Sequence, residues 1–522
     1  MRLSLARVTG RVAAASALLC ATLLVAAPAE AHQADQFATS PKTLGLAGAG
    51  SVLTDGGGSL FSMPSAVALE AQDIFRVSWI GGRVHLAETV GVQRIDRDGA
   101  PVPSESLADS QRLPEQALTP NGVTVDLLKQ LGPFVTAGAY VTFPIPYLYF
   151  HDSQDPWSPN VVRWRNRMAQ ATGVVGGAVR LPVRGLPGVG GVSKESALQG
   201  GVWLGFSLGI LPNANIEIDL DLIGVDDGEN QPFIDVALRD VDLVVRARFR
   251  PTFSLLVEGG TFHEALEGLR VGVVARPPTR VNIDPIHLDV EVLDLGNLLA
   301  LFNAVDRIQA EVWLGLVDFY EPWQIKLALG YQADRWAVSV DGQWNDWSSM
   351  IASYGRVVTG DDGSSGTLTI EFLDGYDYEV AGRRVVGVEA FRDSFDLAVA
   401  GEVVPLSLPV WPGKPPLRLT VRAGYRYASS MLRPMDGPSA LLDGDVHTGA
   451  VGLGFSFPSL PIFDGPFVVD WGLQVQRLGG MDLPKTEAAL EGIAGMPVAY
   501  EDGARWPGGW AVVTGLQVGT GF

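Results

Sequence analysis

Residues 323–347, WQIKLALGYQADRWAVSVDGQWNDW, alternate between apolar side chains and polar or small ones with a period of two. The apolar face of the first part would carry Trp323, Ile325, Leu327, Leu329 and Tyr331. After the short segment 332–334 the alternation resumes and continues to Trp344. This pattern predicts two amphipathic antiparallel strands joined by a tight turn. Strands of about nine to thirteen residues are long enough to cross a bilayer at a tilt.

Other segments repeat the pattern. Segments 240–250, 417–427, 469–476 and 510–522 alternate in the same way. Aromatic residues lie near several strand ends, which suits the interfacial girdles of a membrane barrel. The alternative, a secreted β-sandwich or propeller, would have strands nearer five or six residues long. The sequence therefore predicts an all-β protein, a transmembrane antiparallel β-barrel of roughly 12 to 16 strands.

The composition excludes several other classes of protein. The 522 residues carry a net charge of −20, with a mean hydropathy of +0.18. An acidic chain does not suit a nucleic-acid binder, which needs a basic surface. Cys20 is the single cysteine, so a disulfide framework is excluded. Beyond residue 31 there is no run of about 18 apolar residues, which argues against a bundle of transmembrane helices.

Residues 1–31 have the features of a secretory signal peptide. Three arginines precede an apolar stretch at 13–27, and Ala29-Glu30-Ala31 matches a cleavage site of the A-x-A kind. A membrane anchor is the alternative, but the stretch is short for one. An exported chain without spanning helices can cross a membrane only as a closed barrel. We therefore expect a multi-pass β-barrel in the bacterial outer membrane.

The connections between the predicted strands fall into two classes. Short ones are 263–267, 332–334 and 458–464, and long polar ones are 96–120, 144–170, 293–310, 358–384, 430–444 and 479–505. Short periplasmic turns and long external loops are typical of bacterial outer-membrane barrels. The last predicted strand ends at Phe522. A terminal aromatic residue resembles the signal that the barrel assembly machinery reads in such proteins.

Residues 32–72 do not alternate. Glycines recur in the stretch 45–58, and the segment is rich in small and apolar residues. A phosphate-binding loop is excluded because no Gly-Lys-Ser/Thr follows. A plug inside the barrel explains the segment better. The chain then divides into a signal peptide (1–31), an N-terminal hatch or plug (32–72) and a transmembrane β-barrel (73–522).

Three stretches suggest a family. GLAGAG at 45–50, EPWQIKLALGYQ to DWSSM at 321–350 and LTVRAGY at 419–425 resemble the FadL/TodX-type outer-membrane transporters of long-chain fatty acids and other hydrophobic compounds. The hatch motif of that family is matched by Gly48, Gly50, Asp55 and Pro64, and Phe61 keeps one aromatic residue. Departures from the motif are Gly56, Gly58, Met63 and Ser65. The resemblance implies a fourteen-stranded monomeric barrel with an internal hatch, capture of substrate in an apolar pocket, and lateral release into the bilayer.

Two groups of residues are candidates for substrate binding. Arg418, Arg422, Arg426, Arg246, Arg248 and Arg250 would face the lumen, where a cationic wall could hold a carboxylate head group. The alternative is charge balance with the lumenal acids Asp240, Asp242, Asp341, Glu402 and Asp470. In the hatch, Leu60, Phe61 and Met63 could line an acyl pocket, or they could simply pack the hatch against the wall. An aspartate at position 61 is expected to place an unpaired charge in that pocket.

No catalytic motif is present. The six histidines of the chain lie outside G-x-S-x-G and H-E-x-x-H contexts, and the acidic clusters at 226–229 and 361–362 lack an EF-hand pattern. We therefore expect no enzyme activity, no metal and no cofactor. The favoured function is passive uptake of long-chain fatty acids or other hydrophobic compounds. A general diffusion porin and a structural or surface-recognition barrel are the alternatives. Expected partners are outer-membrane lipid, a hydrophobic small molecule and the assembly machinery, with no nucleic acid.

Overall fold

The computed structural model describes residues 37–53, 56–70, 72–94, 116–144, 160–161, 172–181, 201–225, 233–293, 307–349, 355–358, 369–372, 378–380, 383–385, 391–409, 416–433, 441–457, 466–483 and 498–521. Within these ranges the helices are short, with one or two turns each, such as α3 (Pro41–Leu44), α4 (Gly58–Ser62) and the 3₁₀ helix η1 (Pro64–Leu69). None of the described helices is long and apolar enough to cross a membrane. The predicted signal peptide (1–31), Asp55 and Phe522 lie outside the described residues.

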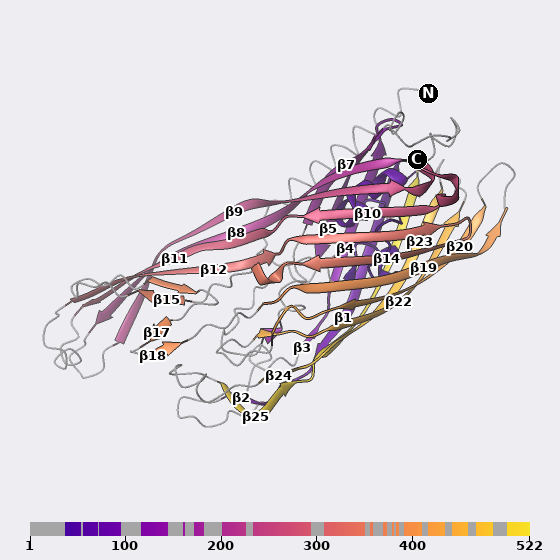
Figure 1. Ribbon diagram of the computed structural model, residues 1–522. Helices are drawn as coiled ribbons and strands as arrows, with labels where there is room; N and C mark the ends of the chain where they lie inside the picture. The colour runs from indigo at the N-terminus through magenta and orange to yellow at the C-terminus, as the bar shows by residue number, and fades with distance from the viewer. Residues whose placement is uncertain are drawn as a thin grey trace.

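Fourteen strands form a closed antiparallel barrel (Figure 1). In order around the barrel they are β1 (Ile74–Leu86), β4 (Asn121–Gln130), β5 (Val135–Pro144), β7 (Thr172–Leu181), β8 (Val202–Val225), β9 (Phe233–Glu258), β10 (Leu269–Arg276), β13 (Gln324–Gln332), β14 (Trp336–Asn345), β19 (Ser394–Leu408), β20 (Leu417–Ala428), β22 (Val446–Phe457), β23 (Phe467–Leu478) and β26 (Gly509–Gly521). The last strand closes on the first, from Ile74 opposite Gly521 to Leu86 opposite Gly509. The predicted all-β transmembrane barrel is thus confirmed.

The two ends of the barrel differ in their connections. At the end where β1 begins and β26 stops, the connections include 131–134, 333–335 and 409–416, with a longer one at 182–201. The opposite end carries the connections at 87–120, 145–171, 346–393, 429–445 and 479–508. Because long loops face the outside in such barrels, this second end is the extracellular one.

Two strands run far beyond the length that a bilayer needs. β8 has 24 residues and β9 has 26, against about 9–11 for a tilted crossing. With β11 (Thr279–Leu293) and β12 (Arg307–Glu321) they form an extension on the extracellular side (Figure 1). The strand predicted at 240–250 is therefore only the middle of β9. Arg246 and Arg248 lie on its backbone in this region, ahead of Arg250.

Smaller elements lie among the extracellular connections and at the turns. They are β2 (Val90–Arg94), β3 (Gln116–Leu118), β6 (Asn160–Val161), η5 (Gly259–Thr261), η6 (Glu264–Leu266), η8 (Trp347–Ser349), β15 (Gly355–Val358), β16 (Thr369–Phe372), β17 (Tyr378–Val380), β18 (Arg383–Val385), β21 (Leu441–Leu442), β24 (Met481–Asp482) and β25 (Val498–Trp506). Of these, β2, β24 and β25 pair into a three-stranded sheet.

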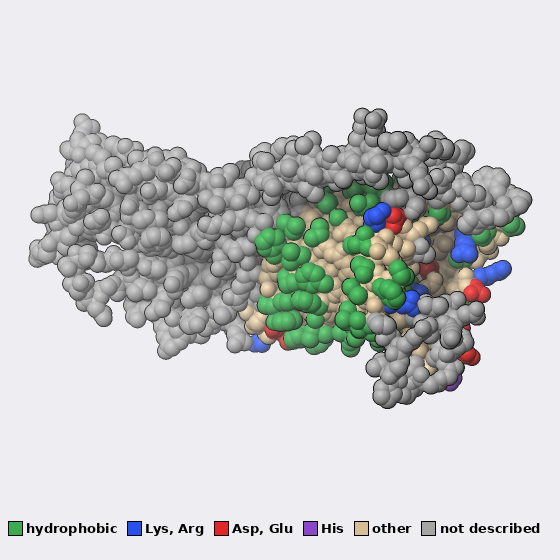
Figure 2. Space-filling model, turned by 90° about the horizontal axis from the view of Figure 1, so that it is seen from above, with side chains coloured by type: hydrophobic (Ala, Val, Ile, Leu, Met, Phe, Trp, Pro, Cys, Tyr) green, Lys and Arg blue, Asp and Glu red, His purple; other side chains and the backbone are tan. Residues whose placement is uncertain are grey.

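The barrel is apolar outside and polar inside. Large outward side chains stay exposed, for example Trp79, Leu327, Tyr425, Val451 and Leu516. Figure 2 shows such hydrophobic side chains gathered over one side of the described wall. The inward positions of the same strands hold buried polar groups, including Asp470, Gln474 and Gln517. This inverted arrangement is stable where lipid surrounds the barrel.

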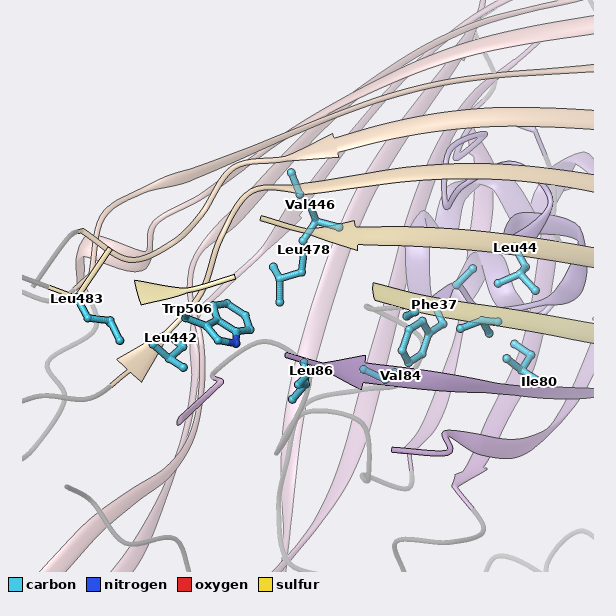
Figure 3. Close-up of a cluster of buried hydrophobic side chains, with 14 of the residues drawn as sticks. Phe37, Leu44, Ile80, Val84, Leu86, Leu442, Val446, Leu478, Leu483 and Trp506 are labelled. Atoms are coloured by element: carbon cyan, nitrogen blue, oxygen red, sulfur yellow. The ribbon is translucent and has the colours of Figure 1, made fainter. Parts of the chain in front are cut away.

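A hydrophobic cluster joins the N-terminal segment to the extracellular ends of the strands (Figure 3). Phe37, Leu44, Ile80, Val84, Leu86, Leu442, Val446, Leu478, Leu483 and Trp506 belong to it. The Trp506 indole nitrogen donates to the carbonyl of Ala87 at 2.9 Å. The sheet of β2, β24 and β25 is thereby fixed to the end of β1, whereas Phe37 lies at the other side of the cluster, near Val84 and Ile80 (Figure 3).

The orientation of β20 gives a direct test of this topology. Val421 is 37% exposed, whereas Arg422, beside it, is 7% exposed. In a background in which Cys20, the single cysteine of the chain, is replaced by serine, a Val421→Cys variant should react with a lipid-soluble maleimide. Thr420→Cys, on the inward face, should react at least tenfold more slowly. Faster labelling at 420 than at 421 would invert the register.

Candidate functional site

Residues 37–53 and 56–70 lie inside the barrel, because they contact strands around much of the wall. α3 packs on β22, β23 and β26, whereas α4 and η1 pack on β5, β7 and β8. The approach is so close that a Cβ atom on Gly472 would lie 2.3 Å from the carbonyl oxygen of Pro41, and one on Gly424 would lie 2.4 Å from that of Leu46. The wall therefore needs glycine where the segment crosses it.

Hydrogen bonds tie this segment to several strands. Ser207 Oγ on β8 donates to the carbonyl of Leu60 at 2.7 Å, and the Ser65 amide donates to Ser254 Oγ on β9 at 2.7 Å. Tyr140 on β5 donates its hydroxyl to the carbonyl of Thr39 at 3.0 Å. Across the lumen, the Ser51 amide donates to Asp341 Oδ2 at 3.0 Å.

The predicted hatch motif has clear conformational roles at three positions. Gly48 and Gly50 have φ angles of 78° and 88°, a region that glycine enters without steric cost. Pro64 is the first residue of η1, where a missing amide proton does no harm. That the segment acts as a hatch remains a prediction.

A cavity of about 130 Å³ lies between this segment and the barrel wall. Its apolar lining includes Phe37, Ala49, Phe61, Trp347, Ala398 and Met431. Charged side chains from the wall also reach it, namely Arg276, Glu321, Lys326, Asp341, Asp396 and Arg426. The cavity therefore presents both an apolar surface and charged groups, as a site for an amphiphile would.

Phe61 lies against two arginines of the wall. The guanidinium carbons of Arg250 and Arg276 lie 4.6 Å and 5.1 Å from the centre of its ring. Arg276 also donates to the Phe61 carbonyl at 2.6 Å, and Arg250 forms a buried ion pair with Glu321. The expectation that an aspartate at position 61 would be unpaired therefore needs revision, because two cations lie close to this position.

The other two hatch candidates take no part in lining the cavity. Leu60 is buried in a cluster with Leu128 and Tyr140. Met63 is buried with Val52, and its methyl group lies over Gly272 of β10. The alternative interpretation, packing of the hatch on the wall, describes these two residues. Phe61 is the one of the three whose side chain borders the cavity.

The two predicted arginines of β20 differ in position. Arg422 lies between Asp470 and Glu402, with nitrogen–oxygen distances of 2.5 Å and 3.2 Å, and does not line the cavity. Arg426 does line it, paired with Asp396 at 2.5 Å. Charge balance, the alternative given above, accounts for Arg422, and the acids Glu402 and Asp470 are two of those expected for it.

Sequence reasoning missed Lys326 on β13. This lysine reaches the cavity, and its Nζ lies 3.5 Å from Ser51 Oγ. Among the described residues no carboxylate comes within ion-pair distance of it, whereas Arg422 and Arg426 both have acidic partners. Its inward position follows from the alternation of 323–331, but its lack of an ionic partner depends on the register of the neighbouring strands.

The segment 344–349, which carried the family resemblance, anchors the extracellular end of β14. The Trp344 indole and the Ser348 amide donate to the two oxygens of Asp393, at 3.0 Å and 3.2 Å. Burial would raise the pKa of Asp393, but these hydrogen bonds lower it below its ordinary value. Trp347 stacks on Phe391 with 6.2 Å between ring centres and lines the cavity. Within the described ranges, no group of three potential metal ligands occurs.

Comparison with known proteins identifies the architecture. No protein-family model and no curated protein sequence matches the chain. Among solved structures, a Pseudomonas aeruginosa FadL homologue superimposes with a TM-score of 0.51 and 15% sequence identity, covering 93% of this chain and 98% of that one. This chain has the FadL-type fold.

Two further matches to that fold are more distant. The CymD monoaromatic hydrocarbon channel gives a TM-score of 0.41 at 11% identity, covering 93% of this chain and 97% of that chain. The Ralstonia pickettii toluene transporter TbuX gives 0.42 at 12% identity, covering 92% and 98%. The match to the FadL homologue confirms the FadL-type fold that the resemblance in the sequence implied, that of an outer-membrane barrel.

Proposed function

We propose that this protein is a passive uptake channel of the outer membrane for hydrophobic compounds that carry an anionic head group, long-chain fatty acids among them. The observation that carries the proposal is the cavity between the N-terminal segment and the wall. Lys326, which has no ionic partner among the described residues, lines this cavity together with Phe61 and Met431. A carboxylate placed there would supply the missing counter-charge. The FadL-type fold supports transport, and two of the structural matches are named as a hydrocarbon channel and a toluene transporter.

The charged groups around the cavity favour an anionic ligand over a neutral hydrocarbon. Arg426 is neutralised by Asp396, and Arg250 by Glu321. Lys326 lies on the inward face of β13, where Asp341 of β14 already accepts a hydrogen bond from Ser51. A hydrogen bond between a charged donor and a carboxylate contributes more than a neutral one. A substrate with an apolar tail and a carboxylate head would therefore use both halves of the lining.

The same geometry argues against the alternative function, a general diffusion porin. Residues 37–70 contact strands on opposite sides of the barrel, so they obstruct the path that a general diffusion pore needs. A structural or surface-recognition barrel would have no need of an internal cavity that combines apolar and charged residues.

Uptake measurements test the proposed function. Expressed in a host that lacks its own long-chain fatty acid uptake, the protein should restore entry of labelled carboxylates. Apparent affinity should rise with chain length, because each buried methylene contributes about 0.8 kcal/mol, or roughly fourfold in affinity, until the cavity is filled. An affinity independent of chain length, together with rapid entry of small sugars, would favour the porin instead.

A further inference from the structure

A row of basic and aromatic residues crosses the outer surface of the barrel. In the register of the sheet, His85 of β1 is opposite Trp510 of β26, Trp510 is opposite Arg477 of β23, and Arg477 is opposite His447 of β22. Arg83 lies two residues before His85 on the same face of β1. We call these five residues the basic row.

The basic row faces the lipid side of the wall. Trp510 is on the same face of β26 as Leu516, and Arg477 is on the same face of β23 as Val475, both of which are exposed apolar residues. Arg83, His447 and Arg477 are themselves exposed. All five residues lie near the strand ends that lead into the long connections, so the row is at the extracellular edge of the apolar belt.

The charges of the row are not used within the described part of the protein. Arg83 and Arg477 have no ion pair among the described residues, and Arg477 makes one loose contact, from Nη2 to the Pro507 carbonyl at 3.4 Å. His447 shares a hydrogen bond with the Tyr425 hydroxyl at 2.7 Å. The nearby carboxylate, Asp445, accepts from the Tyr427 hydroxyl and from the Ser430 amide, each at 2.8 Å.

Position and charge together indicate the ligand. An arginine facing the hydrocarbon core is unfavourable, and the penalty falls toward the interface, where tryptophan and tyrosine also gather. The groups that an outward arginine meets at this level are the lipid head groups. Arginine binds phosphate through two parallel hydrogen bonds. Arg83 and Arg477 lie on strands separated by β26 and are offset by two residues in the register, so their backbones are about 10 Å apart across the sheet and about 7 Å apart along it.

We propose that the basic row binds the head group of a phosphorylated glycolipid of the outer leaflet, with Arg83 and Arg477 each holding one phosphate and Trp510 lying between them. The row is continuous with the lipid-facing belt, and its charge is complementary to such a head group. This lipid site lies on the outside of the wall, and it does not depend on the proposed transport function.

The test uses the full exported chain in lipid nanodiscs, with a defined bis-phosphorylated lipid A as the probe and its dephosphorylated form as the comparison. Native mass spectrometry should show the phosphorylated lipid bound at least tenfold more tightly. The double variant Arg83→Gln, Arg477→Gln should lose this preference. Arg335→Gln, which removes an exposed arginine from the short turn 333–335 at the other end, should bind as the unchanged protein does.

Three results would overturn the lipid site. The first is equal binding of the two lipid forms, and the second is an unchanged preference in the double variant. The third is displacement of the lipid by inorganic phosphate at the concentration of the lipid, because the row would then recognise free phosphate. Heat-modifiable migration on gels verifies assembly. Should the double variant not assemble, each single arginine variant is expected to weaken binding of the phosphorylated lipid at least threefold, and unchanged binding in both would equally reject the site.

Discussion

A Gly424→Val variant should leak small polar solutes at least tenfold faster than the unchanged protein. The reason is the contact between β20 and the N-terminal segment, where even a Cβ atom on Gly424 would lie 2.4 Å from the carbonyl carbon and oxygen of Leu46. Backbone atoms cannot give way as a flexible side chain can, so the segment around Leu46 must move off the wall. Deleting residues 41–68 should have a larger effect in the same direction. The resulting barrel should have a large and unselective conductance.

Single-channel conductance in planar bilayers measures this effect. The matched control is Gly449→Val on the neighbouring strand β22, where a Cβ atom would meet nothing within 4 Å. The control should keep the low conductance of the unchanged protein. If the deletion variant assembles and conducts no better than the control, residues 37–70 do not close the pore, and the proposal that they form a hatch fails.

The sequence alone was sufficient to predict the positions of several barrel strands, but it did not predict the extracellular extension. β13, β14, β20 and β23 lie within two or three residues of their predicted positions, because each has one face in lipid and one in the lumen and so alternates clearly. The strand predicted at 240–250 ends directly before Pro251, a residue that has no amide proton to donate to a sheet. β9 nevertheless passes through Pro251, which is opposite Leu208 of β8.

The candidate site was predicted less completely, for a physical reason. Alternation tells which residues face the lumen, but it does not tell which charges meet there. Arg422 was a good candidate until the register placed it opposite Glu402 and within reach of Asp470. Lys326 faces the same lumen from a strand whose neighbours provide no carboxylate at ion-pair distance within the described residues. Strand register, which a single sequence does not contain, decides between the two.

Arg422 has two acidic partners, whereas Lys326 has none among the described residues. A Lys326→Met variant should therefore change the substrate selectivity of uptake. Uptake of carboxylated substrates should fall about tenfold or more, because a charge-assisted hydrogen bond contributes about 1.5–3 kcal/mol. Uptake of an uncharged compound of the same length should change less than twofold. Methionine keeps the length and apolar stem of the lysine, and Asp341 keeps its hydrogen bond from the Ser51 amide.

Two further variants separate recognition from structure. Lys326→Arg retains the cation and should keep most of the carboxylate uptake. Arg422→Met removes a cation that already has two acidic partners, so any loss there should affect barrel assembly and both substrate classes alike. Competition between a labelled fatty acid and its methyl ester, in cells with equal amounts of heat-modifiable barrel, gives the selectivity directly. Equal loss of acid and ester uptake in Lys326→Met would assign the lysine a structural role, and no loss of either would remove it from the substrate path. Only a selective loss of the acid is consistent with a carboxylate bound at Lys326, because the ester has the same tail and lacks the charge.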